Sequence, residues 1–123
     1  MKRLSLLMIL IVLMLLIVTG CKKQSFVGDS TGNNVQFIMD YSILNGTKTH
    51  EIKLEKGASV NVIIENESGK LDILVADTNG EEIYKGNNAT SRTFSLKILK
   101  ADTYKFSVTG SNAKGSVSFK VAD

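Results

Sequence analysis

The sequence predicts an all-β protein, an antiparallel β-sandwich with a jelly-roll-like arrangement of about eight strands after an N-terminal signal helix. One observation is that apolar residues recur at every second position after residue 34, the period of half-buried strands. A second is that these short runs are separated by turns rich in Gly and Asn. A third is that no stretch after residue 21 has helical spacing over a useful length.

The N-terminus has the three parts of a secretory signal. Lys2 and Arg3 give a positive start, and the run Leu4–Val18 contains Ser5 as its single polar residue. Small residues follow before the first cysteine. An uncleaved transmembrane helix is the alternative, but such a run spans roughly 25 Å, less than the ~30 Å hydrocarbon core. Both interpretations place the rest of the chain on the outer side of a membrane.

The segment Val18-Thr19-Gly20-Cys21 resembles the lipobox of bacterial lipoproteins, in which an aliphatic residue and two small residues precede an obligatory cysteine. The resemblance implies cleavage between Gly20 and Cys21 and a diacylglyceryl group, with acyl chains such as palmitate, on the sulfur of Cys21. It implies a protein that is anchored to the outer face of the cell membrane or to an outer membrane. No other cofactor is expected.

The sequence predicts three regions: a signal peptide over 1–20, a lipidated cysteine with a flexible tether over 21–34, and a sandwich domain over 35–123. The tether is predicted because 22–34 is rich in Lys, Ser, Gly and Asn and shows no sustained period. About ninety residues are enough for one small domain and too few for two.

Eight strands are expected in the domain. In chain order, their inward-facing residues are Val35, Phe37, Met39, Tyr41 and Ile43; Ile52 and Leu54; Val60, Val62 and Ile64; Leu71, Ile73 and Val75; Ile83; Phe94, Leu96 and Ile98; Tyr104, Phe106 and Val108; and Val117, Phe119 and Val121. Asn45-Gly46 predicts a type I′ hairpin turn, since both residues tolerate positive φ. Further turns are expected at Lys56-Gly57, Ser68-Gly69 and 77–80, and loops at 86–91 and 110–115.

The segments 71–84 and 101–121 resemble the later strands of bacterial pre-peptidase C-terminal domains, which are non-catalytic, jelly-roll-like sandwiches. This chain departs from the pattern at two places. Asp72 alone represents the usual pair of alternating acidic residues, and Asp102 replaces the usual Gly before Thr-Tyr. The resemblance therefore implies the sandwich fold and no calcium site.

Composition excludes several function classes. Removal of Lys2 and Arg3 leaves 13 basic against 12 acidic residues, so no basic surface for nucleic acid is expected. Cys21 is the single cysteine and His50 the single histidine, so neither an intramolecular disulfide nor a zinc site is expected.

Two further patterns leave alternatives open. Asp77-x-Asn79-Gly80 resembles part of a calcium loop, but the same residues form tight turns, and the turn is favoured. Tyr84 follows Ile83 directly, so it is predicted to face outward and is the candidate aromatic ligand contact.

The predicted function is that of a non-enzymatic binding or accessory module, whose partner is a protein or a cell-envelope polymer. The alternative is a carbohydrate-binding module with Tyr84 on a shallow face. A third hypothesis is a small hydrolase in which His50 acts with Asp40, Asp72, Asp77 or Asp102. No catalytic motif accompanies these residues, so no catalytic residue is expected.

Overall fold

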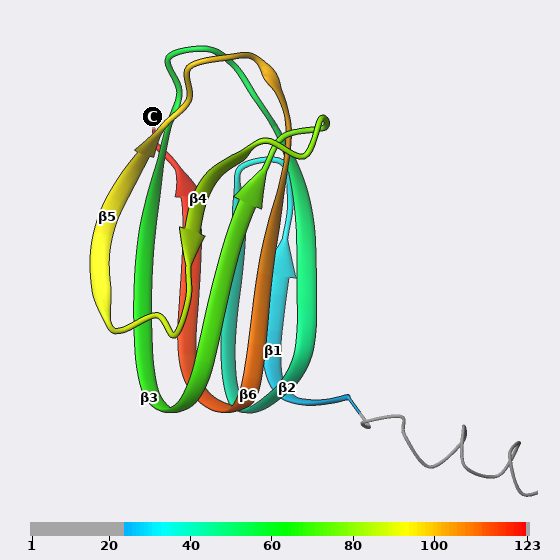
Figure 1. Cartoon of the computed structure of the whole chain (residues 1–123), viewed down its shortest axis with the longest axis vertical. Coiled ribbons are helices and arrows are strands. Elements are labelled where there is room, and N and C mark those ends of the chain that lie inside the picture. The colour runs from blue at the N-terminus through cyan, green and yellow to red at the C-terminus, as the bar shows by residue number, and fades with distance from the viewer. Residues whose placement is uncertain (1–23, 123) are drawn as a thin grey trace, which may run out of the picture.

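The computed structural model describes residues 24–122 and consists of strands and their connections (Figure 1). The strands are β1 (Ser25–Gly32), β2 (Gln36–Leu54), β3 (Ser59–Ala76), β4 (Glu82–Gly86), β5 (Arg92–Lys97) and β6 (Asp102–Val121). All pairs are antiparallel, in the order β1-β2-β6-β3-β4, with β5 beside β3. The predicted all-β antiparallel fold is confirmed.

Three strands are long enough to take part in both layers of the sandwich. β2, β3 and β6 have 19, 18 and 20 residues, and Figure 1 shows each of them turning over at the same end of the molecule. The two halves of β3 pair with opposite halves of β6, as Val62↔Phe119 and Val75↔Phe106 show. The sheet is therefore folded over on itself.

We name the layers by their strands. The five-stranded layer contains β1, β5 and residues 36–44, 59–66 and 115–121 of the long strands. The four-stranded layer contains β4 and residues 46–54, 70–76 and 102–110. The end where the long strands turn over is called the folded end, and the opposite end, where most connections run, is called the open end.

The hairpin predicted at Asn45-Gly46 is wrong. The halves of β2 on either side of it pair with β6 and not with each other, with register shifts around Leu44. Gly46 has a φ of 113°, but Asn45 is not among the described residues with positive φ. Ser68-Gly69 is likewise a bend inside β3. Bulges and glycines turn the sheet over without ending the strands, so separately predicted strands are halves of longer ones.

The bends of neighbouring strands are locked together at the folded end. The side-chain amide of Asn45 donates to Oδ1 of Asn112 over 3.0 Å, and the backbone N–H of Asn112 donates back to Oδ1 of Asn45 over 2.6 Å. A Cβ on Gly69 would overlap the carbonyl of Asn112. Only glycine therefore fits at Gly69, where two backbones approach closely.

The flexible tether predicted over 22–34 is also wrong over most of its length. Residues 25–32 form β1, which pairs with β2 from Ser25↔Asn45 to Gly32↔Phe37. Its pattern was hidden because β1 is an edge strand on which Phe26 alone packs against the core. Residues 22–24 are what remains between Cys21 and the first strand.

The signal helix, the cleavage site at Gly20 and the lipid site at Cys21 lie outside the described residues. Over the part of the chain that the structure describes, no helix has the length and apolar character needed to cross a membrane.

The core lies between the two layers and follows the predicted alternation. Aromatic rings meet across it, with 4.9 Å between the ring centroids of Phe106 and Phe119. Three predicted inward residues are exposed instead. Val35 lies in the β1–β2 connection, Ile43 is displaced by the bulge that buries Leu44, and Ile83 is displaced by a register shift in the pairing of β4 with β3. Tyr41 is buried as predicted, but its hydroxyl has no hydrogen-bond partner among the described residues.

Candidate functional site

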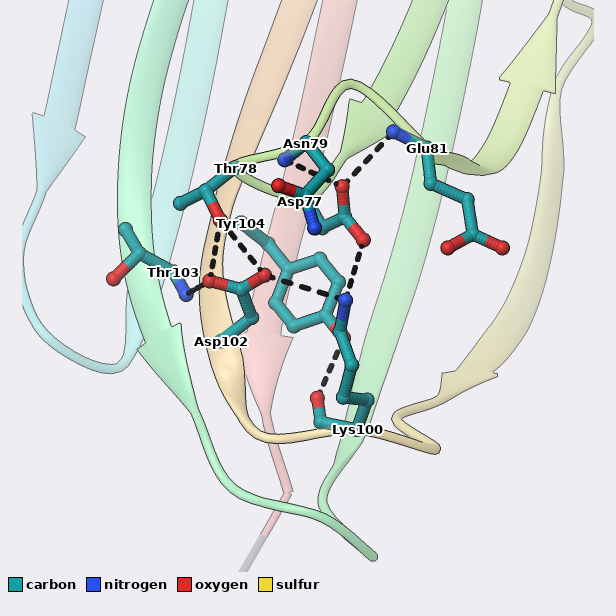
Figure 2. A network of polar contacts seen from close by, with 8 residues as sticks. All are labelled: Asp77, Thr78, Asn79, Glu81, Lys100, Asp102, Thr103 and Tyr104. Atoms are coloured by element: carbon teal, nitrogen blue, oxygen red, sulfur yellow. Dashed lines mark hydrogen bonds and ion pairs between the residues drawn. The ribbon is translucent and has the colours of Figure 1, made fainter.

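The Asp77 turn joins β3 to β4 at the open end (Figure 2). Oδ1 of Asp77 accepts hydrogen bonds from the backbone N–H groups of Asn79 and Glu81, both over 2.9 Å. The backbone N–H of Gly80 donates to the carbonyl of Asp77 over 3.1 Å. The turn predicted from Asp, Asn and Gly is confirmed, since the side chain of Asp77 takes up the backbone donors of its own loop.

Lys100 links this turn to the start of β6. Its Nζ lies 2.9 Å from Oδ2 of Asp77 and 3.6 Å from Oδ2 of Asp102. The hydroxyl of Thr78 donates to the carboxylate of Asp102 over 3.0 Å, and the backbone N–H of Thr103 donates to it over 2.7 Å. One ammonium and two carboxylates therefore join two connections that lie far apart in the sequence (Figure 2).

The charges of this network perturb its titration. The hydrogen bond from Lys100, followed by that from the Glu81 N–H, lowers the pKa of Asp77 below its ordinary value. The backbone N–H of Thr103 is the main cause that lowers the pKa of Asp102. The pKa of Lys100 is raised, chiefly by its hydrogen bond to Asp77. All three groups are therefore held in their charged forms at neutral pH.

The network closes the open end of the core. Asp77 is 7% exposed, and the hydroxyl of the buried Tyr104 donates to the carbonyl of Lys100 over 2.6 Å. Both carboxylate oxygens of Asp77 thus have protein partners. The ammonium of Lys100 lies beside this carboxylate, in the place that a bound calcium ion would take. Within residues 24–122, no group of three or more His, Cys, Asp or Glu side chains is arranged to hold a metal ion.

Sequence reasoning found Asp77 as a turn residue but missed Lys100, which lies 23 positions away and carries no local pattern. A signal existed at Asp102, which stands where the domains that this segment resembles usually have a glycine. In the structure, its carboxylate accepts a hydrogen bond from Thr78 and lies close to the ammonium of Lys100.

The residues of the hydrolase hypothesis are not brought together. His50 packs against Phe37, with 5.4 Å between ring centroids, and its Nε2 lies 2.8 Å from the carbonyl of Asn33. None of the four aspartates hydrogen-bonds to His50 in the described part of the chain. Asp40 is exposed on the five-stranded layer, Asp72 lies on the four-stranded layer, and Asp77 and Asp102 lie at the open end.

Tyr84 does not face outward as predicted. It lies opposite Val75 and packs partly buried against the core, whereas Ile83 is the more exposed neighbour. The ring of Tyr84 contacts that of Phe94 across the layers, with 4.8 Å between the ring centroids. The guanidinium carbon of Arg92 lies 4.5 Å from the centroid of the Phe94 ring. A register shift after Val75 decides which of the two residues faces the core. The sequence alone left this open, because Ile83 and Tyr84 are adjacent and both largely apolar.

A shallow groove lies on the outer face of the four-stranded layer. Its volume is about 340 Å³, and it is lined by Thr47, Asp72, Ile73, Leu74, Lys85, Asn87, Ser107 and Thr109 from β2, β3, β6, β4 and the loop after β4. Oδ1 of Asp72 accepts the backbone N–H of Asn88 over 2.7 Å, and the hydroxyls of Thr47 and Thr109 are 2.8 Å apart. The strands thus hold the polar groups in fixed places.

The groove can bind but shows no catalytic arrangement. It offers hydroxyl, amide, carboxylate and ammonium groups around the apolar side chain of Leu74. A ligand that lies across the strands would meet several hydrogen-bonding groups and one apolar contact. None of its eight lining residues is a His or a Cys.

The sequence matches no protein-family model, and no curated protein matches it significantly. Among solved structures, it is similar to PliG, a periplasmic inhibitor of g-type lysozyme from Aeromonas hydrophila, at 14% identity over 83% of this chain and 90% of that chain, with a TM-score of 0.47.

Two other solved structures are also similar to this chain. A structure described as CBM4 is 9% identical over 84% of this chain and 78% of that chain, with a TM-score of 0.46. The pre-peptidase C-terminal domain of a Bacillus anthracis collagenase is 12% identical over 80% of this chain and 89% of that chain, with a TM-score of 0.45. The two layers of the structure itself support the sandwich fold that the sequence resemblance implied. At these identities the similarities concern the fold and not the ligand.

Proposed function

We propose that this chain is an extracytoplasmic, membrane-anchored lipoprotein whose β-sandwich is a non-enzymatic binding module. One observation carries the proposal: Val18-Thr19-Gly20-Cys21 follows an apolar run and directly precedes a segment that folds into a strand from Ser25 onward. In this interpretation Cys21 is the N-terminal residue of the mature protein and carries the diacylglyceryl group.

The proposed lipid is sufficient for stable attachment. Burial of acyl chains contributes about 0.8 kcal/mol per methylene, so two long chains with roughly thirty methylenes contribute on the order of 20 kcal/mol. A residue without a thiol at position 21 cannot form the thioether to the diacylglyceryl group, so the chain loses this contribution altogether.

The anchor is tested by metabolic labelling with palmitate in the bacterial cell. The wild-type chain is expected to incorporate the label and to fractionate with membranes. Cys21→Ala is expected to lose both. Incorporation into Cys21→Ala, or a wild-type product that is soluble with an unmodified thiol, contradicts the proposal.

The groove on the four-stranded layer is the proposed binding surface, and a polysaccharide of the cell envelope is the favoured ligand. Polyhydroxylated chains present hydroxyl groups in rows, and the groove presents matching donors and acceptors in Thr47, Asp72, Lys85 and Ser107. The predicted contact Tyr84 is replaced in this proposal by Asp72 and Lys85, because the ring of Tyr84 packs against the core.

Binding is tested with isolated cell-wall polymer and with arrayed glycans. Replacement of Asp72 and Lys85 by Ala is expected to weaken binding at least about tenfold, the effect of losing ~1.4 kcal/mol. Lys105→Ala is the matched control, since Lys105 lies on the same layer, two residues from Ser107 and outside the groove.

Absence of polymer binding by the wild type contradicts the polysaccharide assignment. Capture of a protein by cross-linking at the same groove would instead favour the protein partner. An equal loss of binding in Lys105→Ala and in the Asp72 and Lys85 double variant would place the surface elsewhere. Binding by Tyr84→Ala is measured as well, because the sequence alone predicted Tyr84 as the ligand contact.

A further inference from the structure

The folded end of the sandwich lies next to the proposed lipid. β1 begins at Ser25, and three residues separate it from Cys21. Four consecutive Cα steps span at most about 14 Å even when fully extended. With the proposed lipid inserted, the sulfur of Cys21 would lie at the level of the headgroups, and the start of β1 would then lie close to that level.

Two exposed apolar side chains lie at this end. Val27 of β1 and Ile43 of β2 are direct cross-strand partners on the five-stranded layer, and they are 54% and 43% exposed. Ile43 lies just before the bend of β2 at Asn45 and Gly46, and Val27 lies opposite Ile43 on β1. Paired, exposed β-branched residues gain from transfer out of water.

Polar and basic groups accompany this apolar pair. A hollow of about 570 Å³ at the folded end is lined by Gln24, Asn45, Gly46, Thr109, Gly110, Ser111 and Asn112. The bend segments 43–48, 65–70 and 111–115 contain the basic residues Lys48, Lys70 and Lys114 and the acidic residues Glu65 and Glu67.

The balance of charge at this end is positive. Glu65 and Glu67 offset two of the three lysines in these segments, and Glu67 is 3.5 Å from the ammonium of Lys114. Lys22 and Lys23 add two positive charges in the connection itself. Amide donors and an excess of lysine complement phosphate groups, and anionic headgroups attract lysines close to the membrane surface.

We infer that the short connection holds the folded end of the sandwich against anionic phospholipid headgroups, with Val27 and Ile43 at the interface. This inference rests on the proposed lipid anchor. It fixes the orientation of the domain, with the long strands roughly perpendicular to the membrane surface. Each half of a long strand has about nine residues at about 3.3 Å each, so the Asp77–Lys100 network lies about 30 Å from the headgroups.

The test uses the full lipidated chain in vesicles of equal parts phosphatidylglycerol and phosphatidylcholine with a nitroxide quencher on the headgroup. The proposed thioether blocks Cys21, so an introduced cysteine is the free thiol that takes a fluorophore. Ile43→Cys and Ile63→Cys form a matched pair, because the two isoleucines are 43% and 42% exposed on the same layer. Ile63 lies further from the bends, beside Ser118.

We expect the nitroxide to quench most of the fluorescence at position 43 and little of it at position 63. A ten-residue Gly-Ser insertion after Lys23, with a reach of about 17 Å, is expected to remove most of the quenching at position 43. Quenching that is unchanged by the insertion would overturn the role of the short connection.

The anchor and the orientation fail in different ways. Equal quenching at positions 43 and 63 in a chain that incorporates palmitate overturns the orientation and leaves the anchor in place. A wild-type chain that incorporates no palmitate removes both.

Discussion

The two ends of the sandwich are closed by different physical means. At the folded end the three long strands cross between the layers at their bends. The closure there depends on glycine, on the buried side chains of Leu44 and Ala113, and on the reciprocal hydrogen bonds of Asn45 and Asn112. At the open end the chain crosses in connections, and the Asp77–Lys100–Asp102 network covers the core.

The folded end is therefore stabilised mainly by close packing of backbone and side chains, and the open end mainly by charge. The bends at the folded end contain no ion pair that is buried, since Lys114 and Glu67 are both exposed. The open end depends on charges that titrate. We therefore expect the folded end to respond to side-chain volume and the open end to respond to pH.

The largest effect is expected from Gly69→Ala at the folded end. Gly69 has a φ of 80° and Gly80 a φ of 81°, but a Cβ would overlap the carbonyl of Asn112 at Gly69 and would meet nothing within 4 Å at Gly80. Gly80→Ala is expected to cost about 1–2 kcal/mol for the backbone conformation alone. Gly69→Ala is expected to cost about 3–4 kcal/mol, since the overlap adds strain. Equal losses in denaturant unfolding would refute the steric closure.

The next effect is expected from Asp77→Asn at the open end. The amide keeps an oxygen for the turn but places N–H donors against the ammonium of Lys100, so the melting temperature at neutral pH should fall. The pKa of Asp77 is lowered in the folded state, so its contribution is present above the unfolded pKa of ~3.9 and is lost as the pH falls through the folded value.

The difference between wild type and Asp77→Asn should therefore shrink in acid, below about pH 4. Glu55→Gln, an exposed carboxylate at the same end, serves as the control. A melting-temperature difference that stays constant from neutral to acidic pH would show that charge does not close this end.

A smaller loss is expected from Tyr104→Phe, which removes the hydroxyl that binds the carbonyl of Lys100. An intramolecular hydrogen bond of this kind contributes about 0.5–1.5 kcal/mol, and the ring itself is retained. Urea unfolding should show this loss with an unchanged m-value. A neutral substitution would mean that the carbonyl finds water as an equivalent partner.

The sequence predicted the elements of the fold whose signal is local. The alternation at Val60, Val62 and Ile64 shows which face is buried, because period two is a property of neighbouring residues. The sequence did not distinguish a bend from a hairpin at Asn45-Gly46, because Asn and Gly occur in both. The residue that pairs with Leu44 at the bend, Ala113, is far away in the sequence. β1 was missed for a related reason, because an edge strand with a single inward contact has no alternation to detect.

The candidate sites divide in the same way. The Asp77 turn is encoded within five residues, and its form was predictable. The groove is not, because Thr47, Asp72, Lys85 and Ser107 come from four strands and meet only through the register of the sheet. The outward orientation of Tyr84 was wrong because the bulge after Val75 sets the phase of β4, and nothing in the sequence of β4 marks that bulge.

The smallest effect, of opposite sign, is expected from Tyr41→Phe towards the folded end. Tyr41 and Tyr104 are both 2% exposed, but the hydroxyl of Tyr41 has no partner among the described residues. Removal of an unsatisfied buried hydroxyl should stabilise the domain slightly, by up to about 1 kcal/mol.

An alkaline titration gives an independent check on Tyr41. Burial, followed by the charge of Asp40, raises the pKa of Tyr41 to about 12 from 10.0. The wild type should therefore keep its stability below pH ~10 and lose it as the pH rises towards 12, where the unfolded chain ionises first. The near-ultraviolet absorbance of tyrosinate should lose its latest-titrating step in Tyr41→Phe, whose advantage over the wild type should grow above pH ~10. If Tyr41→Phe is less stable than the wild type, the hydroxyl of Tyr41 has a partner, and a further hydrogen bond contributes to the closure of the folded end.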